Sequence, residues 1–222
     1  MDFSPIFISI RTALCAIAVT FFLGLFAARW VAFMKNRYWK LILDGLFTLP
    51  LVLPPTVAGF FLLYIFGVKR PVGKFLVDFF AVRVPFSFGA TVLAAVVISF
   101  PLMYRSARGA MEQVDETLLF AGRTLGMSEG RIFFRVLLPN ALPGILSGGI
   151  LAFARGLGEF GATTMIAGNI AGETRTLPLA VYSAVAAGDM PTAYQYVIVL
   201  VCLSFIMIAG MNYFGTKGKH KC

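Results

Sequence analysis

The stretch LLFAGRTLGMSEGRIFFRVLLPNALPGI, residues 118–145, decides how this chain is organised, because it interrupts long apolar runs on both sides. Three glycines precede Pro139 within it. It also carries the charges of Arg123, Glu129, Arg131 and Arg135. A segment this polar does not cross a bilayer. The spacing of its apolar residues, however, is typical of helices rather than of a flexible loop. It therefore predicts a structured aqueous segment between two membrane spans.

The composition places the rest of the chain in a membrane. Of 222 residues, 59% are hydrophobic and only 13% are charged, whereas soluble domains carry about 25% charged residues. The apolar runs are continuous rather than alternating, which predicts spanning helices instead of a barrel. The net charge of +9 comes from basic residues that flank these runs, so we expect a lipid bilayer and no nucleic acid as partner.

Five segments have the roughly 20 mostly apolar residues that a helical span needs. A further candidate, Leu177–Ala187, is too short and is expected to lie at the interface or to dip part-way into the membrane. The five predicted spans are Ile6–Val31, Leu46–Phe66, Phe86–Tyr104, Ala141–Gly161 and Tyr194–Phe214.

The distribution of Lys and Arg predicts the orientation of these spans. The segments 29–44 and 105–139 and the tail hold twelve of them, against five in the segments on the other side. Because basic residues accumulate in cytoplasmic segments, the N-terminus should lie outside and the C-terminus, with Cys222, inside. The stretch quoted above is then cytoplasmic.

The second predicted span is unusual because TLPLVLPPTVAG, residues 48–59, contains Pro50, Pro54 and Pro55. Each proline removes a backbone donor and disturbs the helix. Two interpretations stay open: a kinked structural helix, or a broken helix whose Pro54 and Pro55 line a transport pathway.

The fourth predicted span combines a packing stripe with two charges. Arg155 and Glu159 are spaced i,i+4, so they can meet on one helix face. Charges inside a membrane usually face a partner or a wet cavity, which leaves two possibilities, a self-neutralising pair or a contribution to the pathway. Thr163 is placed with them as a further candidate pathway residue. The stripe of small residues, which predicts close helix packing, consists of Gly144, Gly148, Ala152 and Gly156.

The cytoplasmic stretch predicts two short helices. In residues 116–125, the small and apolar side chains of Leu118, Ala121, Gly122 and Leu125 share one face, which suits a groove on another protein. Gly126 should end this helix. Ser128 can cap a second helix, Glu129–Leu138, which Pro139 should end. The alternative is an amphipathic hairpin that lies on the membrane without a protein partner.

This stretch resembles the cytoplasmic signature of ABC-importer permease subunits. The signature has a glycine, nine residues and then Ile-x-Leu-Pro, and this chain has Gly126, nine residues and Val136-Leu137-Leu138-Pro139. The Glu-Ala-Ala positions of the family align with Phe120-Ala121-Gly122, so the family's glutamate is missing here. In the family this segment is a coupling helix that docks on the ATPase subunit. The resemblance therefore assigns ATPase coupling to segment 112–139, with Leu118, Ala121, Gly122, Gly126, Val136, Leu138 and Pro139 as its residues.

Longer stretches are similar to the permeases of molybdate ABC importers, among them LPLVLPPTVAGF (49–60), FFRVLLPNALPGIL (133–146) and ARGLGEFGAT (154–163). The resemblance implies an all-α, type I importer permease fold, in which residues 1–222 form one membrane domain. It implies ATP-driven uptake of molybdate or a similar oxyanion across a bacterial or archaeal cytoplasmic membrane, with tungstate or sulfate/thiosulfate as alternatives. The implied partners are an ABC ATPase subunit, an extracytoplasmic oxyanion-binding protein and a second copy of the chain.

Nothing in the sequence indicates that this chain itself catalyses a reaction. It has no GxxxxGK[ST] phosphate-binding loop, no cluster of His and Cys ligands and no nucleophile paired with a base. We therefore expect no catalytic, cofactor or metal site, and ATP should be hydrolysed on the partner subunit. Two less favoured alternatives are an autonomous secondary transporter, which five spans do not divide into equal repeats, and a membrane-embedded enzyme built around Arg155 and Glu159.

Overall fold

The computed structural model describes residues 2–217, with side chains through Gly210. These residues form helices and connecting loops, without a β-strand. In chain order the elements are α1 (Ser4–Ala32), α2 (Arg37–Val52), α3 (Pro55–Phe66), α4 (Pro71–Phe80), α5 (Phe88–Glu112), α6 (Glu116–Thr124), α7 (Glu129–Ile132), the π-helical η1 (Phe133–Leu137), α8 (Leu138–Leu157), α9 (Gly161–Ala167), α10 (Leu177–Ala186) and α11 (Met190–Lys217).

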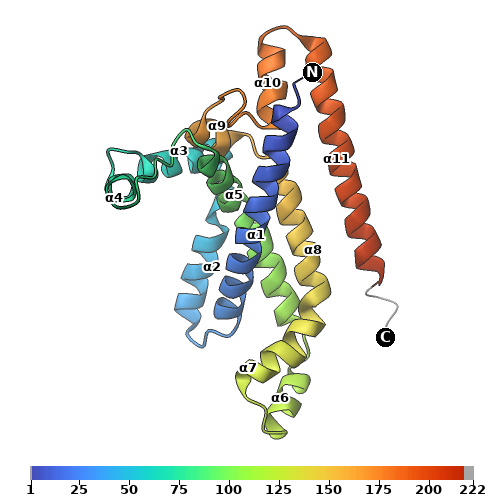
Figure 1. Ribbon diagram of the computed structural model, residues 1–222. Coiled ribbons are helices and arrows are strands. Elements are labelled where there is room, and N and C mark those ends of the chain that lie inside the picture. The colour runs from blue at the N-terminus through green and yellow to red at the C-terminus, as the bar shows by residue number, and fades with distance from the viewer. Residues whose placement is uncertain (1, 218–222) are drawn as a thin grey trace.

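The fold is centred on α1, α5 and α8, which lie side by side (Figure 1). Their contact surfaces use small residues, as the glycine stripe predicts. A Cβ on Gly148 would lie 2.3 Å from the Cβ of Ser106, and one on Gly144 would lie 2.7 Å from the Cβ of Ala110. Any larger side chain at these positions would force α8 away from α5, so the stripe sets the distance between the two helices.

The prediction of an all-helical membrane protein with about five spans is confirmed. Within residues 2–217, four helical segments are long and apolar enough to cross a bilayer, and α2 with α3 makes a fifth, bent one. Successive spans run in opposite directions, so the start of α1 and the end of α11 lie at opposite ends of the bundle (Figure 1). The α6–α7 hairpin (residues 115–132) marks one end, and α3, α4, α9 and α10 gather toward the other.

The second predicted span, Leu46–Phe66, differs most from the structure. Its helix begins earlier, at Arg37, and stops at Val52, and α3 then leaves at an angle of 112°. Leu53 and Pro54 are extended between the two helices, because a residue before proline avoids the helical region and neither Pro54 nor Pro55 has an N–H to donate. Pro50 stays inside α2.

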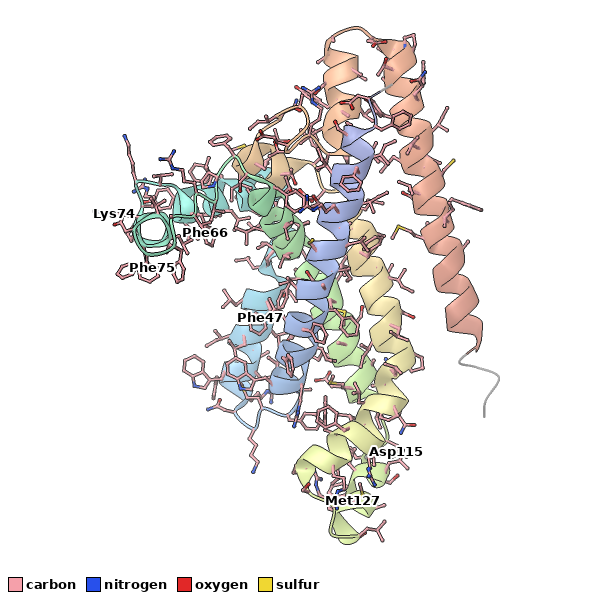
Figure 2. All side chains as sticks on the ribbon, viewed as in Figure 1. Phe47, Phe66, Lys74, Phe75, Asp115 and Met127 are labelled. Carbon is pink, nitrogen blue, oxygen red and sulfur yellow. The ribbon has the colours of Figure 1, made fainter. Side chains whose placement is uncertain are left out.

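The bend creates an arm that projects sideways from the bundle. α3 leads outward to α4, which Figure 1 shows end-on, so α4 runs across the direction of the spans. Gly73 allows α4 to fold tightly against the end of α3, since a Cβ there would lie 2.2 Å from the carbonyl oxygen of Gly67. Lys74 lies at the outer edge of the arm and Phe75 beneath it (Figure 2).

The prediction that Pro139 ends a separate helix is wrong. The helix that begins at Glu129 continues through η1 into α8, giving one segment from Glu129 to Leu157. An α-helical proline clashes with the carbonyl four residues earlier and donates no hydrogen bond. The wider π-helical turn before Pro139 accommodates both effects. The side-chain amide of Asn140 donates to the carbonyl of Val136 at 2.7 Å, which adds a hydrogen bond beside this turn.

The short segment predicted at Leu177–Ala187 is α10, with ten residues. It packs against α11 and the start of α1. The backbone N–H of Leu177 donates to the hydroxyl of Ser9 at 2.7 Å, and the Tyr196 hydroxyl donates to the carbonyl of Asp2 at 3.0 Å. These bonds join the start of α1 to the starts of α10 and α11, at the end of the bundle opposite the hairpin.

Candidate functional site

The α6–α7 hairpin is built by a capped helix. The carboxylate of Asp115 accepts a hydrogen bond from the backbone N–H of Thr117 at 2.9 Å, at the start of α6. That bond lowers the pKa of the Asp115 carboxyl below its ordinary value, so this group is ionised at neutral pH beside the positive end of the helix dipole. This cap is not among the residues predicted from the sequence, although aspartate before a helix is a common signal.

The turn between α6 and α7 depends on Gly126, as predicted. Its φ is +72°, in the left-handed region that glycine adopts without strain. The N–H of Met127 donates to the carbonyl of Gly122 at 3.1 Å and closes the turn. Across it, the guanidinium of Arg123 binds the carboxylate of Glu129 through two bonds, at 2.7 and 3.2 Å. Ser128 occupies the predicted cap position of α7, but its side chain makes no capping hydrogen bond.

The predicted docking face of α6 is only partly exposed. Leu118 is 45% exposed and Leu125 is 80% exposed, and Ala121 lies between them on the surface. Gly122 instead faces inward, where a Cβ would lie 3.1 Å from Cγ1 of Ile132. The outward surface is therefore formed by Leu118, Ala121 and Leu125, while Gly122 lets α6 approach α7.

The other residues assigned to coupling lie in the helix that leaves the hairpin. Val136 and Leu138 are half-buried, and Pro139 is exposed in the first turn of α8. Leu137, which the sequence analysis did not select, is the buried member of this group at 1% exposure. The structure thus assigns these residues to the base of the hairpin and not to the surface of α6.

At the far end of α8, Arg155 and Glu159 meet as their spacing suggests. Nη1 of Arg155 lies 2.7 Å from Oε2 of Glu159, and the side chains are 32% and 2% exposed. Glu159 is not in α8, however, because the helix ends at Leu157. Its other oxygen accepts the backbone N–H of Ala162 at 2.8 Å, so the same carboxylate neutralises Arg155 and holds the start of α9.

The break between α2 and α3 lies against the break between α8 and α9. A Cβ on Gly161, at the start of α9, would lie 3.0 Å from the Cβ of Pro55, at the start of α3. Pro54 is exposed, whereas Thr163 is 1% exposed and is enclosed by the chain's own helices. The structure therefore brings the starts of α3 and α9 together. Pro54 is exposed there and Pro55 and Arg155 are partly exposed, whereas Glu159 and Thr163 are buried.

A charged cluster between α2 and α5 was missed by the sequence analysis. Arg108 binds Asp44 and also donates to Glu112 at 2.9 Å, while Lys40 donates to Glu112 at 3.0 Å. The Tyr104 hydroxyl donates to Asp44 at 3.0 Å. The i,i+4 spacing of Tyr104, Arg108 and Glu112 was a usable signal, but the partners on α2 are separated by about sixty residues and could not be inferred from it.

Comparison with known sequences identifies the family. Residues 20–218 match the family described as binding-protein-dependent transport system inner membrane component. The molybdenum transport system permease protein ModB of Haemophilus influenzae is 44% identical over 82% of this chain and 80% of its own length. The protein of the same name from Escherichia coli K12 is 41% identical, over 93% of this chain and 90% of the relative.

Comparison with solved structures shows the same fold. An inward-facing structure of the methionine ABC transporter MetNI matches with a TM-score of 0.69 at 16% identity, over 98% of this chain and 99% of that one. A crystal structure of an amino acid ABC transporter with histidines matches with a TM-score of 0.67 at 18% identity, over 94% and 90%. With its type I importer permease fold and a family match that covers most of its length, the chain belongs to the inner membrane components of binding-protein-dependent transport systems.

Proposed function

We propose that the chain is the permease subunit of an ATP-driven importer of molybdate or a closely related oxyanion. The observation that carries this proposal is its 41–44% identity, over most of its length, to molybdenum transport permeases. The region where the two breaks meet supports it, because broken helices in transporters often line a substrate path. Arg155 lies partly exposed beside this region, where it is paired with Glu159.

The ATPase subunit is proposed to dock on the outer face of α6. Leu118, Ala121 and Leu125 present an apolar surface with a small residue at its centre, which fits a groove on a partner. ATP binding and hydrolysis then take place on that subunit, and the permease needs no cofactor of its own. Docking at this end places the hairpin in the cytoplasm, with the N-terminus outside, in agreement with the distribution of Lys and Arg.

A second copy of the chain and an external oxyanion-binding protein complete the proposed importer. The second copy would cover α2, which has no buried residue in this chain although it is largely apolar. The binding protein would deliver the anion to the end opposite the hairpin, near α9 and the start of α3. High affinity resides in that protein, because tight binding along the path would slow release.

Reconstitution in proteoliposomes tests this function. The permease, its ATPase and its binding protein are combined, and uptake of labelled molybdate is followed with and without ATP. We expect uptake to require all three proteins and ATP, with tungstate competing. Uptake of sulfate or thiosulfate without molybdate would overturn the substrate assignment. Uptake without the ATPase would overturn the importer assignment and favour a secondary transporter.

A further inference from the structure

A half-open cavity of about 530 Å³ lies between the hairpin end of α1 and the α6–α7 hairpin. Phe26, Arg29 and Trp30 line it from α1. Leu119 and Phe133 line it from the hairpin side. The cavity is on the inner side of α6, away from the exposed face formed by Leu118, Ala121 and Leu125. It is therefore separate from the surface proposed to bind the ATPase.

The charge in this cavity is unbalanced. The Arg29 guanidinium lies 4.0 Å from the centre of the Phe133 ring, a cation–π contact that leaves its N–H groups available. Among the described residues, none forms an ion pair with Arg29. The other lining cation, Arg123, is already bound to Glu129. A half-buried guanidinium without an acceptor is suited to bind an anion. The oxygens of a phosphate group can accept two parallel hydrogen bonds from its planar N–H groups.

The cavity lies at the depth of lipid headgroups. α1 has 29 residues, so at a rise of roughly 1.5 Å per residue it exceeds the hydrocarbon core of about 30 Å. The ends of α1 therefore reach the headgroup region, and exposed aromatic side chains indicate this for the end at the hairpin. Phe26, Trp30 and Phe33 are 62%, 59% and 48% exposed there, as is typical of aromatic side chains at a membrane interface. Phe22, which is 59% exposed, extends this aromatic surface toward the bilayer centre.

We propose that this cavity binds one anionic phospholipid. The phosphate accepts hydrogen bonds from Arg29, and an acyl chain lies along Phe26 and Phe22 on the outside of α1. The wall formed by Leu119 and Phe133 brings the lipid into contact with the hairpin. A free phosphate ion would use the guanidinium but not the apolar surface, so the combination favours a lipid. This inference does not depend on which substrate is transported.

Native mass spectrometry of the purified full-length chain tests the proposal. The protein is held in detergent with phosphatidylglycerol or with phosphatidylcholine, and retained lipid is measured. We expect one tightly held phosphatidylglycerol and weaker retention of phosphatidylcholine. Arg29→Gln should lower phosphatidylglycerol affinity about tenfold, the size expected for a charged hydrogen bond. Inorganic phosphate at equal concentration should not displace the lipid.

Two further variants make the test specific. Met34→Trp fills the cavity but leaves Arg29 in place, and it should also reduce lipid retention. Arg37→Gln removes the same charge from the start of α2, at the same end of the molecule but outside the cavity, and should leave retention unchanged. Equal retention by the wild type, Arg29→Gln and Met34→Trp would overturn the proposal. Displacement by inorganic phosphate would show an anion site rather than a lipid site and would also overturn it.

Discussion

At the scale of single residues, the carboxylate of Glu159 contacts both Arg155 and the N–H of Ala162. Substitutions of Arg155 and of Glu159 should therefore differ in how much stability they remove. Arg155→Met leaves a buried carboxylate without its cation. Glu159→Gln retains an oxygen that can accept from Ala162. We therefore expect Arg155→Met to reduce membrane abundance more. The stability loss should lie at or below the low end of the roughly 3–5 kcal/mol for a broken buried pair, because Arg155 keeps 32% of its side chain exposed.

The double variant Arg155→Met/Glu159→Gln separates the two interpretations of this pair. If the residues only neutralise one another, removing both should restore abundance and uptake, since a buried pair is often replaceable as a whole. We expect this outcome because Oε2 of Glu159 lies in ion-pair contact with Arg155 and Oε1 accepts the N–H of Ala162. A double variant that is abundant in the membrane but does not take up molybdate would instead place Arg155 on the path of the anion.

Gly126 offers a second test at this scale. Gly126→Val places a β-branched residue at a φ of +72°, which costs at least about 1–2 kcal/mol. The hairpin should loosen, so co-purification of the ATPase and ATP-driven uptake should both fall while membrane insertion is preserved. Gly172→Val is the matched control, because its φ of +79° gives similar strain far from the hairpin. Equal loss of ATPase binding in both variants would contradict a local role for Gly126.

At the scale of elements, the outer face of α6 is tested without disturbing the fold of the hairpin. Ala121→Arg adds a long charged side chain to the exposed face and should weaken ATPase co-purification. Gly130→Arg adds the same group to α7, at a position with open space around it, and should not. Gly122→Leu should also reduce coupling, but through displacement of α6 from Ile132. Unchanged co-purification with Ala121→Arg would exclude this face as the docking surface.

The α3–α4 arm depends on one close backbone approach. Gly73→Ala would place a methyl group 2.2 Å from the carbonyl oxygen of Gly67 and 2.4 Å from that of Phe66. Backbone atoms cannot yield as a flexible side chain does, so α4 should separate from α3 at a cost of about 1–3 kcal/mol. Thermal unfolding of the purified chain would show a lower Tm. Gly109→Ala, which meets no neighbour in α5, should leave Tm unchanged or raise it.

The sequence predicts an element well when nearby residues determine it, and poorly when contacts with distant segments determine it. The spans and the turn at Gly126 follow from apolar length and from one glycine. The prolines indicated the break after Val52, but the 112° angle is set by packing of α3 on α9. Gly122 was assigned to the outer face because a nine-residue helix gives few positions to distinguish inside from outside. The cluster around Arg108 depends on partners in α2 that are distant in the sequence, which periodicity does not show. The π-helical turn has a local cause at Pro139, but a proline after a helix more commonly ends it.

At the scale of the whole molecule, the orientation in the membrane is the prediction that the others depend on. Cys222 lies outside the described residues, but its accessibility can be measured. An impermeant thiol reagent applied to intact cells should label Cys222 only after permeabilisation, in a variant whose Cys15 and Cys202 are replaced by serine. Labelling from outside would reverse the orientation and place the α6–α7 hairpin on the side where no ATP is available.

The uninterrupted segment from Glu129 to Leu157 has a mechanical consequence for the whole chain. Its 29 residues, at a helical rise of roughly 1.5 Å each, make a rod about 43 Å long. One end carries Glu129, which is bound to Arg123 of α6, and the other ends beside Glu159, which holds α9. No flexible loop lies between them to absorb a displacement. We therefore expect that a tilt of the hairpin also tilts this rod, and that the rod displaces α9 relative to α3 at the opposite end of the bundle.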